Sequence, residues 1–381
     1  MKVIALSIGV ALASAGSIGF AQTDPAESAR AAIVALEEAA GELRAAEGAR
    51  DRVAALTQTV RAYEFGLDAM REGLRRATIR EAALKGVFDA ESDRLAKLLG
   101  VLQSIERAPA PVTLIHPAGP LGAARAGMIL TDVVPTLQAE ATTLRGQLEE
   151  VSVLRQLQQS AVSVLEDGLA GVQDARAALS QAVSDRTDLP RRFVVDEAKM
   201  QALINSTETL ESFASGLMEI EPMSAESGIE APVGLTDRKG TLTLPVLGRV
   251  LRRYYEPDAA GIQRPGIILA TRPLSLVVAP ASGTIRYAGP LLDYGQVAIL
   301  EPQEGILLIL AGMGQVYGNV GEVLPEGAPI GLMGGENPGT QAFLIQSGQG
   351  SNSDHSETLY IELRENGTPV DPENWFAVNK D

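Results

Sequence analysis

The sequence contains no cysteine and only two histidines, His116 and His355. Without cysteine, disulfide frameworks and thiolate metal sites are excluded. Two histidines far apart in the chain cannot build a multi-histidine zinc centre, because a catalytic zinc needs about three protein ligands and an open position for water. His355 lies in a polar segment, QGSNSDHSE, and is predicted to be a solvated surface residue. His116, between two apolar neighbours, is expected to pack in a helical tip.

Aromatic residues are also scarce, at 4% with a single Trp. Acidic residues outnumber basic ones, which gives a formal net charge of -16 over 381 residues. Because nucleic acids and anionic lipids are bound through Lys and Arg clusters, this balance argues against both as main partners. Hydrophobic residues make up 45% of the chain, so a core can form, and the length predicts two or three domains. A ring-poor, Ala- and Leu-rich composition favours long helices packed side by side.

Long apolar runs are absent after the N-terminus. After Lys2, an apolar run precedes the first acidic residue, Asp24, with small residues at Gly19 and Ala21. This pattern predicts a secretory signal peptide at 1–21, cleaved after Ala21; an uncleaved membrane anchor is the alternative. No other segment reaches the ~18 apolar residues that span a bilayer, so the mature chain is expected to be a periplasmic protein with no transmembrane span.

Proline is absent between Pro25 and Pro109, and apolar residues recur there at steps of three and four over 33–74. A second stretch with the same spacing runs over 137–183. Both patterns are typical of a coiled-coil seam. One seam alone would leave an apolar stripe in water, so we expect the two stretches to pair as a long antiparallel coiled-coil hairpin over 22–187.

The segment between the two stretches is rich in proline, and these prolines are expected to prevent a continuous helix. They are Pro109, Pro111, Pro117, Pro120 and Pro135. The second stretch is also too short to pair with the whole first one at the rise of an α-helix. Residues 76–135 are therefore predicted to form a separate helical tip that serves as a docking head.

Residues 190–219 follow with one more helical pattern, and residues 220–240 form an acidic, Pro- and Gly-containing linker. We expect 190–219 to form one amphipathic helix. A flexible tether would hold this helix at a high effective concentration over the following domain, where it could act as a restraining arm. The alternative is a third helix packed on the hairpin. The apolar residues of the restraining arm are Met200, Leu203, Leu210, Phe213 and Leu217.

Residues 241–381 carry short β runs separated by Gly and Pro, among them GIILA, GTIRYAG, GQVAILEP, GILLILAG and TLYIELR. Runs of this length and spacing predict a mostly antiparallel β domain. The predicted fold class is thus multidomain α + β, with a long antiparallel coiled-coil hairpin followed by the β domain.

Six ordered segments of the β domain carry a resemblance to a known family. They are LPVLGRVLRRY (244–254), RPGIILA (264–270), VVAPASGTIRYAG (277–289), DYGQVAIL (293–300), VGEVLPEGAPIGLMG (320–334) and LYIELRENGTPVDPENWF (359–376). The β domain resembles the LytM (lysostaphin-type) metallopeptidase domain, and the whole chain resembles the EnvC family of murein hydrolase activators. The resemblance implies a lysostaphin-like fold with a lipoyl-like core.

The resemblance also implies where zinc ligands would stand in an active member of the family. Active peptidases hold zinc with an H-x-G-x-D segment and an H-x-H segment, and a Y-x-H histidine assists catalysis. Neither Arg nor Ile can coordinate zinc, so we predict a degenerate domain with no metal, no cofactor and no catalytic residue, which is not an enzyme. The degenerate metal positions are Arg264, Ile268, Gly312, Thr358 and Tyr360.

A LytM-type domain without its metal keeps a groove, and the resemblance implies that this groove captures a partner amidase. The groove positions are Tyr294, Val297, Tyr360 and Arg364, and Arg264 stands next to a position where a basic residue is expected. Tyr and Arg are frequent at interface hot spots. Alternatively, the two tyrosines fill the β core.

Tyr360 and Arg364 are four apart on an alternating strand, so both point to one face. Glu362, which alternates with Tyr360, is predicted to lie on an exposed face.

The resemblance therefore implies a non-catalytic periplasmic activator of peptidoglycan (N-acetylmuramoyl-L-alanine) amidases that acts in cell-wall splitting at the division septum. The helical tip would dock on the periplasmic domain of the FtsEX complex, and peptidoglycan is a further candidate ligand. Two alternatives remain: a periplasmic coiled-coil adaptor of a transport system and an active zinc endopeptidase. In adaptors the two lipoyl half-motifs flank the hairpin, whereas here both follow it, which favours the activator.

Overall fold

The computed structural model describes residues 25–106, 119–186, 189–194, 196–220, 223–224, 234–336 and 355–377. The predicted signal peptide and His116 lie outside these residues, as does most of the predicted linker 220–240.

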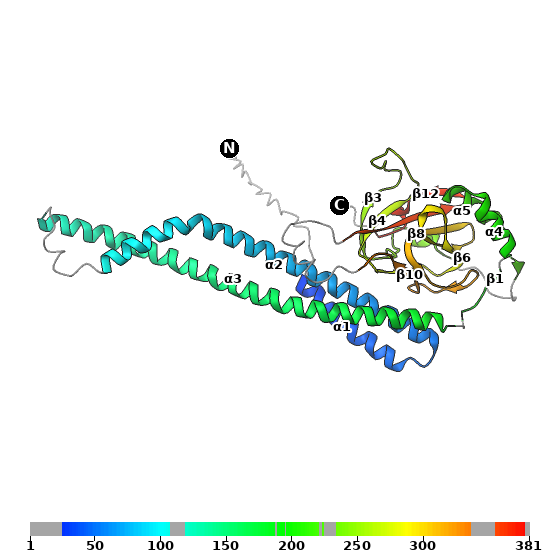
Figure 1. Cartoon of the computed structure of the whole chain (residues 1–381), viewed down its shortest axis with the longest axis horizontal. Helices are drawn as coiled ribbons and strands as arrows, with labels where there is room; N and C mark the ends of the chain where they lie inside the picture. The colour runs from blue at the N-terminus through cyan, green and yellow to red at the C-terminus, as the bar shows by residue number, and fades with distance from the viewer. Residues whose placement is uncertain are drawn as a thin grey trace, which may run out of the picture.

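Three helices form the N-terminal part of the molecule: α1 (Pro25–Ala45), α2 (Ala49–Glu106) and α3 (Gly119–Ser184). Figure 1 shows α2 and α3 side by side along their length, with α1 against the end of α2 that lies near the β domain. The ion pairs Arg80–Glu150 and Arg176–Glu64 show that α2 and α3 run in opposite directions.

The first predicted helical stretch differs from the structure, because it consists of two helices instead of one. The chain turns at 46–48, next to Gly48, and α1 packs back on α2. Gly66 permits this close approach, since a Cβ atom at Gly66 would lie 3.0 Å from the Cβ of Ala32.

The expectation that the prolines prevent a continuous helix is wrong for Pro120 and Pro135, because both lie within α3. Pro120 is the second residue of the helix, where a backbone N–H has no intrahelical partner anyway. Pro135 removes one hydrogen bond from a helix of 66 residues, which favours a kink more than an end. Residues 76–106 and 119–135 thus continue the two long helices, and their connection lies outside the described residues.

The core between α2 and α3 has a seven-residue repeat on both helices. Val60, Leu67 and Leu74 of α2 are buried in one cluster with residues of α3 that repeat at the same interval, namely Leu165, Val172 and Leu179. This repeat confirms the middle part of the predicted apolar seam. The prediction is wrong for Ile33, Leu43 and Leu148, which are exposed.

The C-terminal part is a curled, mostly antiparallel β-sheet with strand order β3-β4-β11-β8-β7-β6-β9, in which β10 pairs with β5 and β8, and β12 pairs with β11. The strands are β3 (Gly248–Arg252), β4 (Ile267–Thr271), β5 (Leu276–Val278), β6 (Gly283–Pro290), β7 (Gln296–Gln303), β8 (Ile306–Val316), β9 (Val323–Leu324), β10 (Pro329–Met333), β11 (Glu357–Glu365) and β12 (Thr368–Val370). The sequence therefore combines a helical N-terminal part with an antiparallel β domain, as expected.

The β-sheet buries side chains on both faces. On β8, Leu308 and Leu310 belong to the core that contains Trp375, whereas Ile309 and Ala311 belong to a second cluster on the opposite face. This alternation follows from the two-residue period of a strand. Another element must therefore pack on the apolar side chains of the second face to shield them from water.

Two short helices provide this cover: α4 (Glu197–Ser206) and α5 (Leu210–Glu219). They replace the single helix predicted at 190–219, because Thr209 caps α5. Its hydroxyl accepts from the N–H of Ser212, which satisfies a helix-end donor and starts a new helix. The two-residue strand β1 (Phe193–Val194) precedes α4 and pairs with the two-residue strand β2 (Met223–Ser224), which follows α5.

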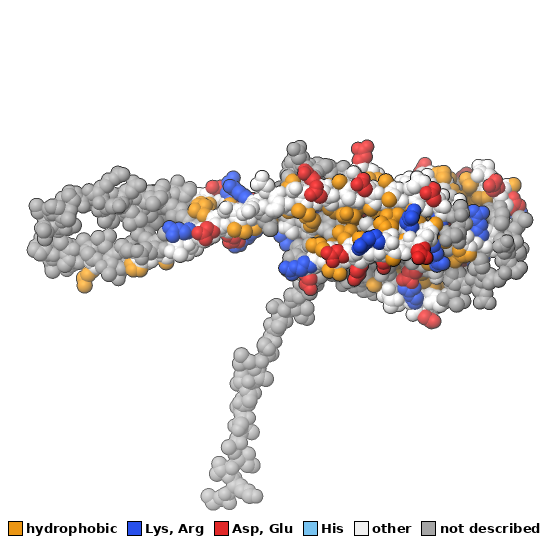
Figure 2. Space-filling view, turned by 90° about the horizontal axis from the view of Figure 1, so that it is seen from below, with side chains coloured by type: hydrophobic (Ala, Val, Ile, Leu, Met, Phe, Trp, Pro, Cys, Tyr) orange, Lys and Arg blue, Asp and Glu red, His pale blue; other side chains and the backbone are white. Residues whose placement is uncertain are grey.

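The helical part also contacts the β domain directly. Leu276, Val278, Tyr317 and Leu332 share the cluster of α2 and α3, and the hydroxyl groups of Tyr317 and Ser180 are 2.8 Å apart. Seen from below, hydrophobic side chains are interspersed with charged ones at the end of the helical part where α1 lies (Figure 2). Within the described ranges, no helix is apolar over a stretch long enough to cross a bilayer.

Candidate functional site

The candidate site is the face of the sheet that α4 and α5 cover. At its centre, β11 presents Tyr360, Glu362 and Arg364 on one face. The Tyr360 hydroxyl donates to Glu362 Oε2 at 2.6 Å, and Arg364 Nε donates to Glu362 Oε1 at 2.5 Å. Arg364 is 0% exposed and Glu362 2% exposed. A charge-assisted network of this kind fixes the orientation of all three side chains.

The environment of Tyr360 keeps its hydroxyl protonated. Burial raises the pKa of Tyr360, and the neighbouring Glu362 carboxylate raises it further by charge repulsion and by accepting the phenolic proton. Tyr360 therefore serves here as a hydrogen-bond donor and as apolar surface.

Apolar side chains surround this polar centre. Val297 and Ile299 of β7, Leu307 and Ile309 of β8 and Tyr287 of β6 form one cluster with Tyr360. The ring centroid of Tyr294 lies 6.4 Å from that of Tyr360. The face is thus an apolar surface with a buried charged centre, which is typical of a protein-binding surface.

The covering helices bury their apolar stripe on this face. Met200, Leu210, Phe213 and Leu217 are buried in the same cluster, and Leu203 packs against it. Phe213 meets Tyr287 edge-on, with ring centroids 4.9 Å apart. These five apolar residues of the predicted restraining arm thus lie over the predicted groove, and none of them belongs to the described cluster of the long helices.

Two buried arginines of the sheet hold α5 by its backbone and side chains. Arg364 Nη1 donates to Ser215 Oγ at 3.2 Å, and Arg286 Nη2 donates to the carbonyl oxygens of Leu217 at 2.9 Å and Ile220 at 3.1 Å. A cation at the last carbonyls of a helix also suits the helix dipole. Arg286 is itself paired with Glu301, at 3.3 Å.

The structure brings together four of the five predicted groove residues. Tyr294, Val297, Tyr360 and Arg364 all lie on the covered face. The fifth, Arg264, lies beside Ile268 in a small pocket with Arg252 and Arg253, and no described residue of the arm lines this pocket.

Four of the positions predicted to be degenerate metal positions, Ile268, Gly312, Thr358 and Tyr360, also meet at one place in the sheet. Tyr360 pairs with Ile268 of β4 and with Ala311 of β8, and Gly312 is so close to the Thr358 carbonyl that a Cβ atom would lie 2.5 Å from it. Ile and Gly offer no donor atom, and the Tyr360 hydroxyl is already bound to Glu362. This donor set does not fit zinc. Among the described residues, no group of three or more His, Cys, Asp or Glu side chains is placed to hold a metal ion.

Sequence reasoning missed Glu362, Arg286 and Glu301. Glu362 was predicted to be exposed, which is wrong, because α5 covers its face of the sheet. The signal was present in the two-residue period, which places Glu362 on the same face as Tyr360 and Arg364. Arg286 and Glu301 lie on paired strands, and nothing in the local sequence distinguishes them from surface charges.

Comparison with known proteins identifies the β domain. The model of peptidase family M23 matches residues 263–372. These residues form an M23 (LytM-type) peptidase domain. The match leaves the helices and the arm outside the M23 domain.

Two curated relatives are an uncharacterized protein of Neisseria meningitidis and an uncharacterized protein of Haemophilus influenzae. The first is 27% identical over 149 residues, covering 39% of this chain and 22% of the relative. The second is 28% identical over 142 residues, covering 37% of this chain and 31% of the relative. The chain spans less than a third of either relative.

Solved structures with a similar domain include three kinds of protein. A putative M23 peptidase of Pseudomonas aeruginosa has a TM-score of 0.31 and 15% identity, covering 49% of this chain and 64% of that one. Helicobacter pylori Csd3 has a TM-score of 0.28 and 19% identity, covering 37% and 36%. A chain of the SpoIIQ–SpoIIIAH pore-forming complex has a TM-score of 0.28 and 21% identity, covering 36% and 92%.

Proposed function

We propose that this protein is a non-catalytic activator of peptidoglycan amidases, and that its M23 domain binds the amidase through the face that α4 and α5 cover. The observation that carries the proposal is the occupation of this face. Four predicted groove residues lie directly beneath the apolar stripe of the arm. A binding surface covered by a segment of its own chain cannot bind a partner until that segment leaves.

The residues at the metal positions support a binding role more than a hydrolytic one. Hydrolysis by an M23 peptidase needs a metal-bound water. Ile268, Gly312 and Tyr360 supply no free ligand for such a metal. Glu362 instead holds Tyr360 and Arg364 in a fixed orientation, and an arginine suits a partner's acidic or polar groups.

The long helices suit the delivery of a signal to the arm. At about 1.5 Å per residue, the 58 residues of α2 and the 66 of α3 form a pair of antiparallel helices roughly 90 Å long. Its far end projects away from the M23 domain (Figure 1). We infer that the protein is exported to the periplasm and acts at the division septum, and that the far end of the hairpin docks on the periplasmic domain of the FtsEX complex.

The test is an amidase assay with dye-labelled peptidoglycan, comparing the full chain with a deletion of residues 196–220. This deletion leaves three residues between β1 and β2, a length that antiparallel hairpins commonly use. The full chain should stimulate a periplasmic amidase weakly and the deletion several-fold more strongly. Adding Val297→Asp to the deletion should abolish both stimulation and amidase binding.

Neither form should release dye without the amidase, with or without added zinc. Dye release by the chain alone would contradict the proposal. So would equal stimulation by the full chain and the deletion.

A further inference from the structure

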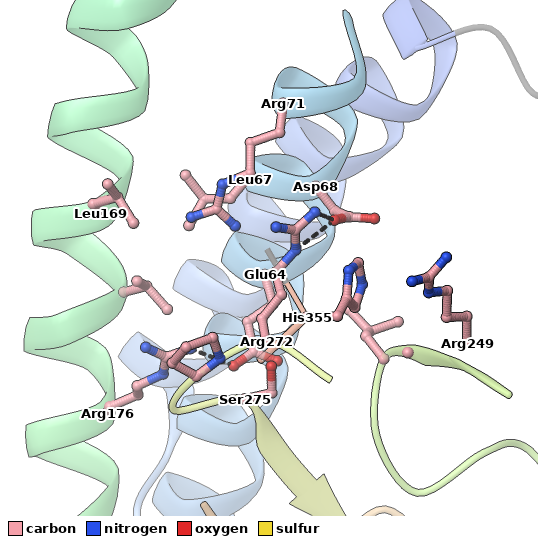
Figure 3. A pocket seen from close by; sticks show the side chains of 14 residues that line it. Glu64, Leu67, Asp68, Arg71, Leu169, Arg176, Arg249, Arg272, Ser275 and His355 are labelled. Carbon is pink, nitrogen blue, oxygen red and sulfur yellow. Dashed lines mark hydrogen bonds and ion pairs between the residues drawn. The ribbon is translucent and has the colours of Figure 1, made fainter. Parts of the chain in front are cut away.

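A cavity lies between the helical part and the M23 domain, away from the covered face. Its volume is about 300 Å³. Figure 3 shows α3 on one side of it, α2 behind it, and segments of the β domain on the other side. His355, predicted to be a solvated surface residue, is instead partly buried in the lining of this cavity.

Positive charge dominates the lining of this cavity. Four arginines line it, Arg71, Arg176, Arg249 and Arg272, against two carboxylates. Both carboxylates are engaged. Glu64 Oε1 accepts from Arg176 Nη2 at 2.7 Å and from the Leu276 N–H at 2.9 Å, and Asp68 accepts from Arg272 Nε at 2.8 Å. This local excess of arginines contrasts with the net charge of -16 of the whole chain, which repels anions from the molecule as a whole.

Arg176, which lines the cavity, has buried donor atoms without an acceptor among the described residues. Its side chain is 9% exposed, and Nη2 donates to Glu64. Nε and Nη1 are buried, and neither has a hydrogen-bond partner among the described residues. Leaving buried charged N–H groups unpaired costs free energy, and an incoming acceptor would recover it.

We propose that this cavity binds a small oxyanion, either a phosphate or a peptide carboxylate, through Arg176 and Arg249. The guanidinium group presents a planar fork of donors that matches the oxygens of both groups. Arg176 belongs to α3 and Arg249 to β3, so the bound anion joins the helical part to the M23 domain. A cation does not suit the cavity, since both carboxylates already accept from arginines. The site is independent of the amidase proposal.

The experiment titrates the full chain with inorganic phosphate and, separately, with a soluble N-acetylmuramyl peptide, at constant ionic strength kept with chloride. Binding is followed by calorimetry and by the thermal midpoint. We expect saturable binding of at least one probe. Arg249→Glu should weaken it by about tenfold or more, because it replaces a donor with a repelling charge. Arg176→Met should abolish it.

The matched control is Arg145→Glu, which makes the same charge change at an exposed position of α3 away from the cavity. It should leave binding unchanged. Saturation by phosphate alone identifies a phosphate site, and saturation by the muramyl peptide alone identifies a carboxylate site. If Arg176→Met does not fold, the comparison of the two Glu variants decides. Absence of saturation with both probes, or equal weakening by Arg249→Glu and Arg145→Glu, would overturn the proposal.

Discussion

Arg364 of β11 donates a hydrogen bond from Nη1 to Ser215 Oγ of α5, at 3.2 Å, so the strand at the centre of the covered face holds the helix that covers it. This contact does not satisfy the whole Arg364 guanidinium. Arg364 Nη2 has no hydrogen-bond partner among the described residues, and the nearest carboxylate of the arm, Glu211, is 4.0 Å away and largely exposed. A partner that places a carboxylate on Arg364 would gain a stronger, charge-assisted bond and so displace the arm.

Phe213 should be the main apolar anchor of the arm, since it is fully buried against Tyr287. Replacing a buried Phe with Ala costs about 3–5 kcal/mol. Because the arm is a small unit, Phe213→Ala should detach it, raise amidase stimulation in the dye-release assay and make 196–220 sensitive to protease.

Phe376→Ala provides the matched control, because Phe376 is buried in the core on the other side of the sheet. This change should lower the free energy of unfolding without raising amidase stimulation. If both variants stimulate equally, loss of stability explains the effect and the restraining role of Phe213 is wrong.

The contact between Arg364 and Ser215 can be measured by a double-mutant cycle. A hydrogen bond to a charged group contributes about 1.5–3 kcal/mol, so Ser215→Ala and Arg364→Gln should be non-additive by an amount in this range in urea unfolding. Ser206 of α4 is exposed and bonds only to the carbonyl of Leu203 among the described residues. The Ser206→Ala and Arg364→Gln changes should therefore be additive, and a similar coupling in both cycles would refute a direct contact.

The sequence allowed the side-chain directions of the site to be predicted, but not the burial of Glu362. The four-residue spacing of Tyr360 and Arg364 placed them on one face, and both lie on that face in the structure. The same period applied to Glu362, yet alternation alone does not say which face of a sheet is solvent-exposed. That depends on where α5 packs, which is a tertiary contact.

Helix boundaries were less predictable for a related reason. The apolar period continues from α1 into α2 and from α4 into α5, so a period-based reading joins each pair into one helix. The breaks depend on local turns near Gly48 and on the Thr209 cap. Likewise, Glu64 and Arg176 are 112 residues apart, and no local pattern could pair them.

Glu64 should be a major determinant of how the helices dock on the M23 domain. Burial raises its pKa, while Arg176 opposes this shift. Its carboxylate bonds to both Arg176 and the Leu276 N–H. Removing one partner of a buried ion pair costs about 3–5 kcal/mol, so Glu64→Ala should lower the free energy of unfolding by roughly that amount.

The control for Glu64 is Glu150→Ala, which removes an exposed ion pair with Arg80 between the same two helices. Exposed pairs contribute little to stability because water screens them, so Glu150→Ala should change the free energy of unfolding far less than Glu64→Ala. Comparable losses for the two variants in denaturant unfolding would show that Glu64 has no special role in docking.

Alkaline titration should report whether the arm covers Tyr360. Burial and the Glu362 carboxylate raise its pKa above the ordinary value of 10.0. The unfolded chain therefore loses this proton first, so the stabilisation linked to Tyr360 is complete below pH 10 and is lost as the pH rises towards the folded-state value. In the folded full chain, Tyr360 should contribute no tyrosinate absorbance near pH 10.

Deleting residues 196–220 should admit water to the Tyr360 ring and lower its pKa. The deletion variant should therefore show one more ionising tyrosine than the full chain, and adding Tyr360→Phe to the deletion should abolish this extra ionisation. Burial also raises the pKa of Tyr317, which lies beneath the long helices, so Tyr317→Phe should change both forms equally. An unchanged tyrosinate titration after the deletion would show that α4 and α5 do not shield Tyr360 in solution.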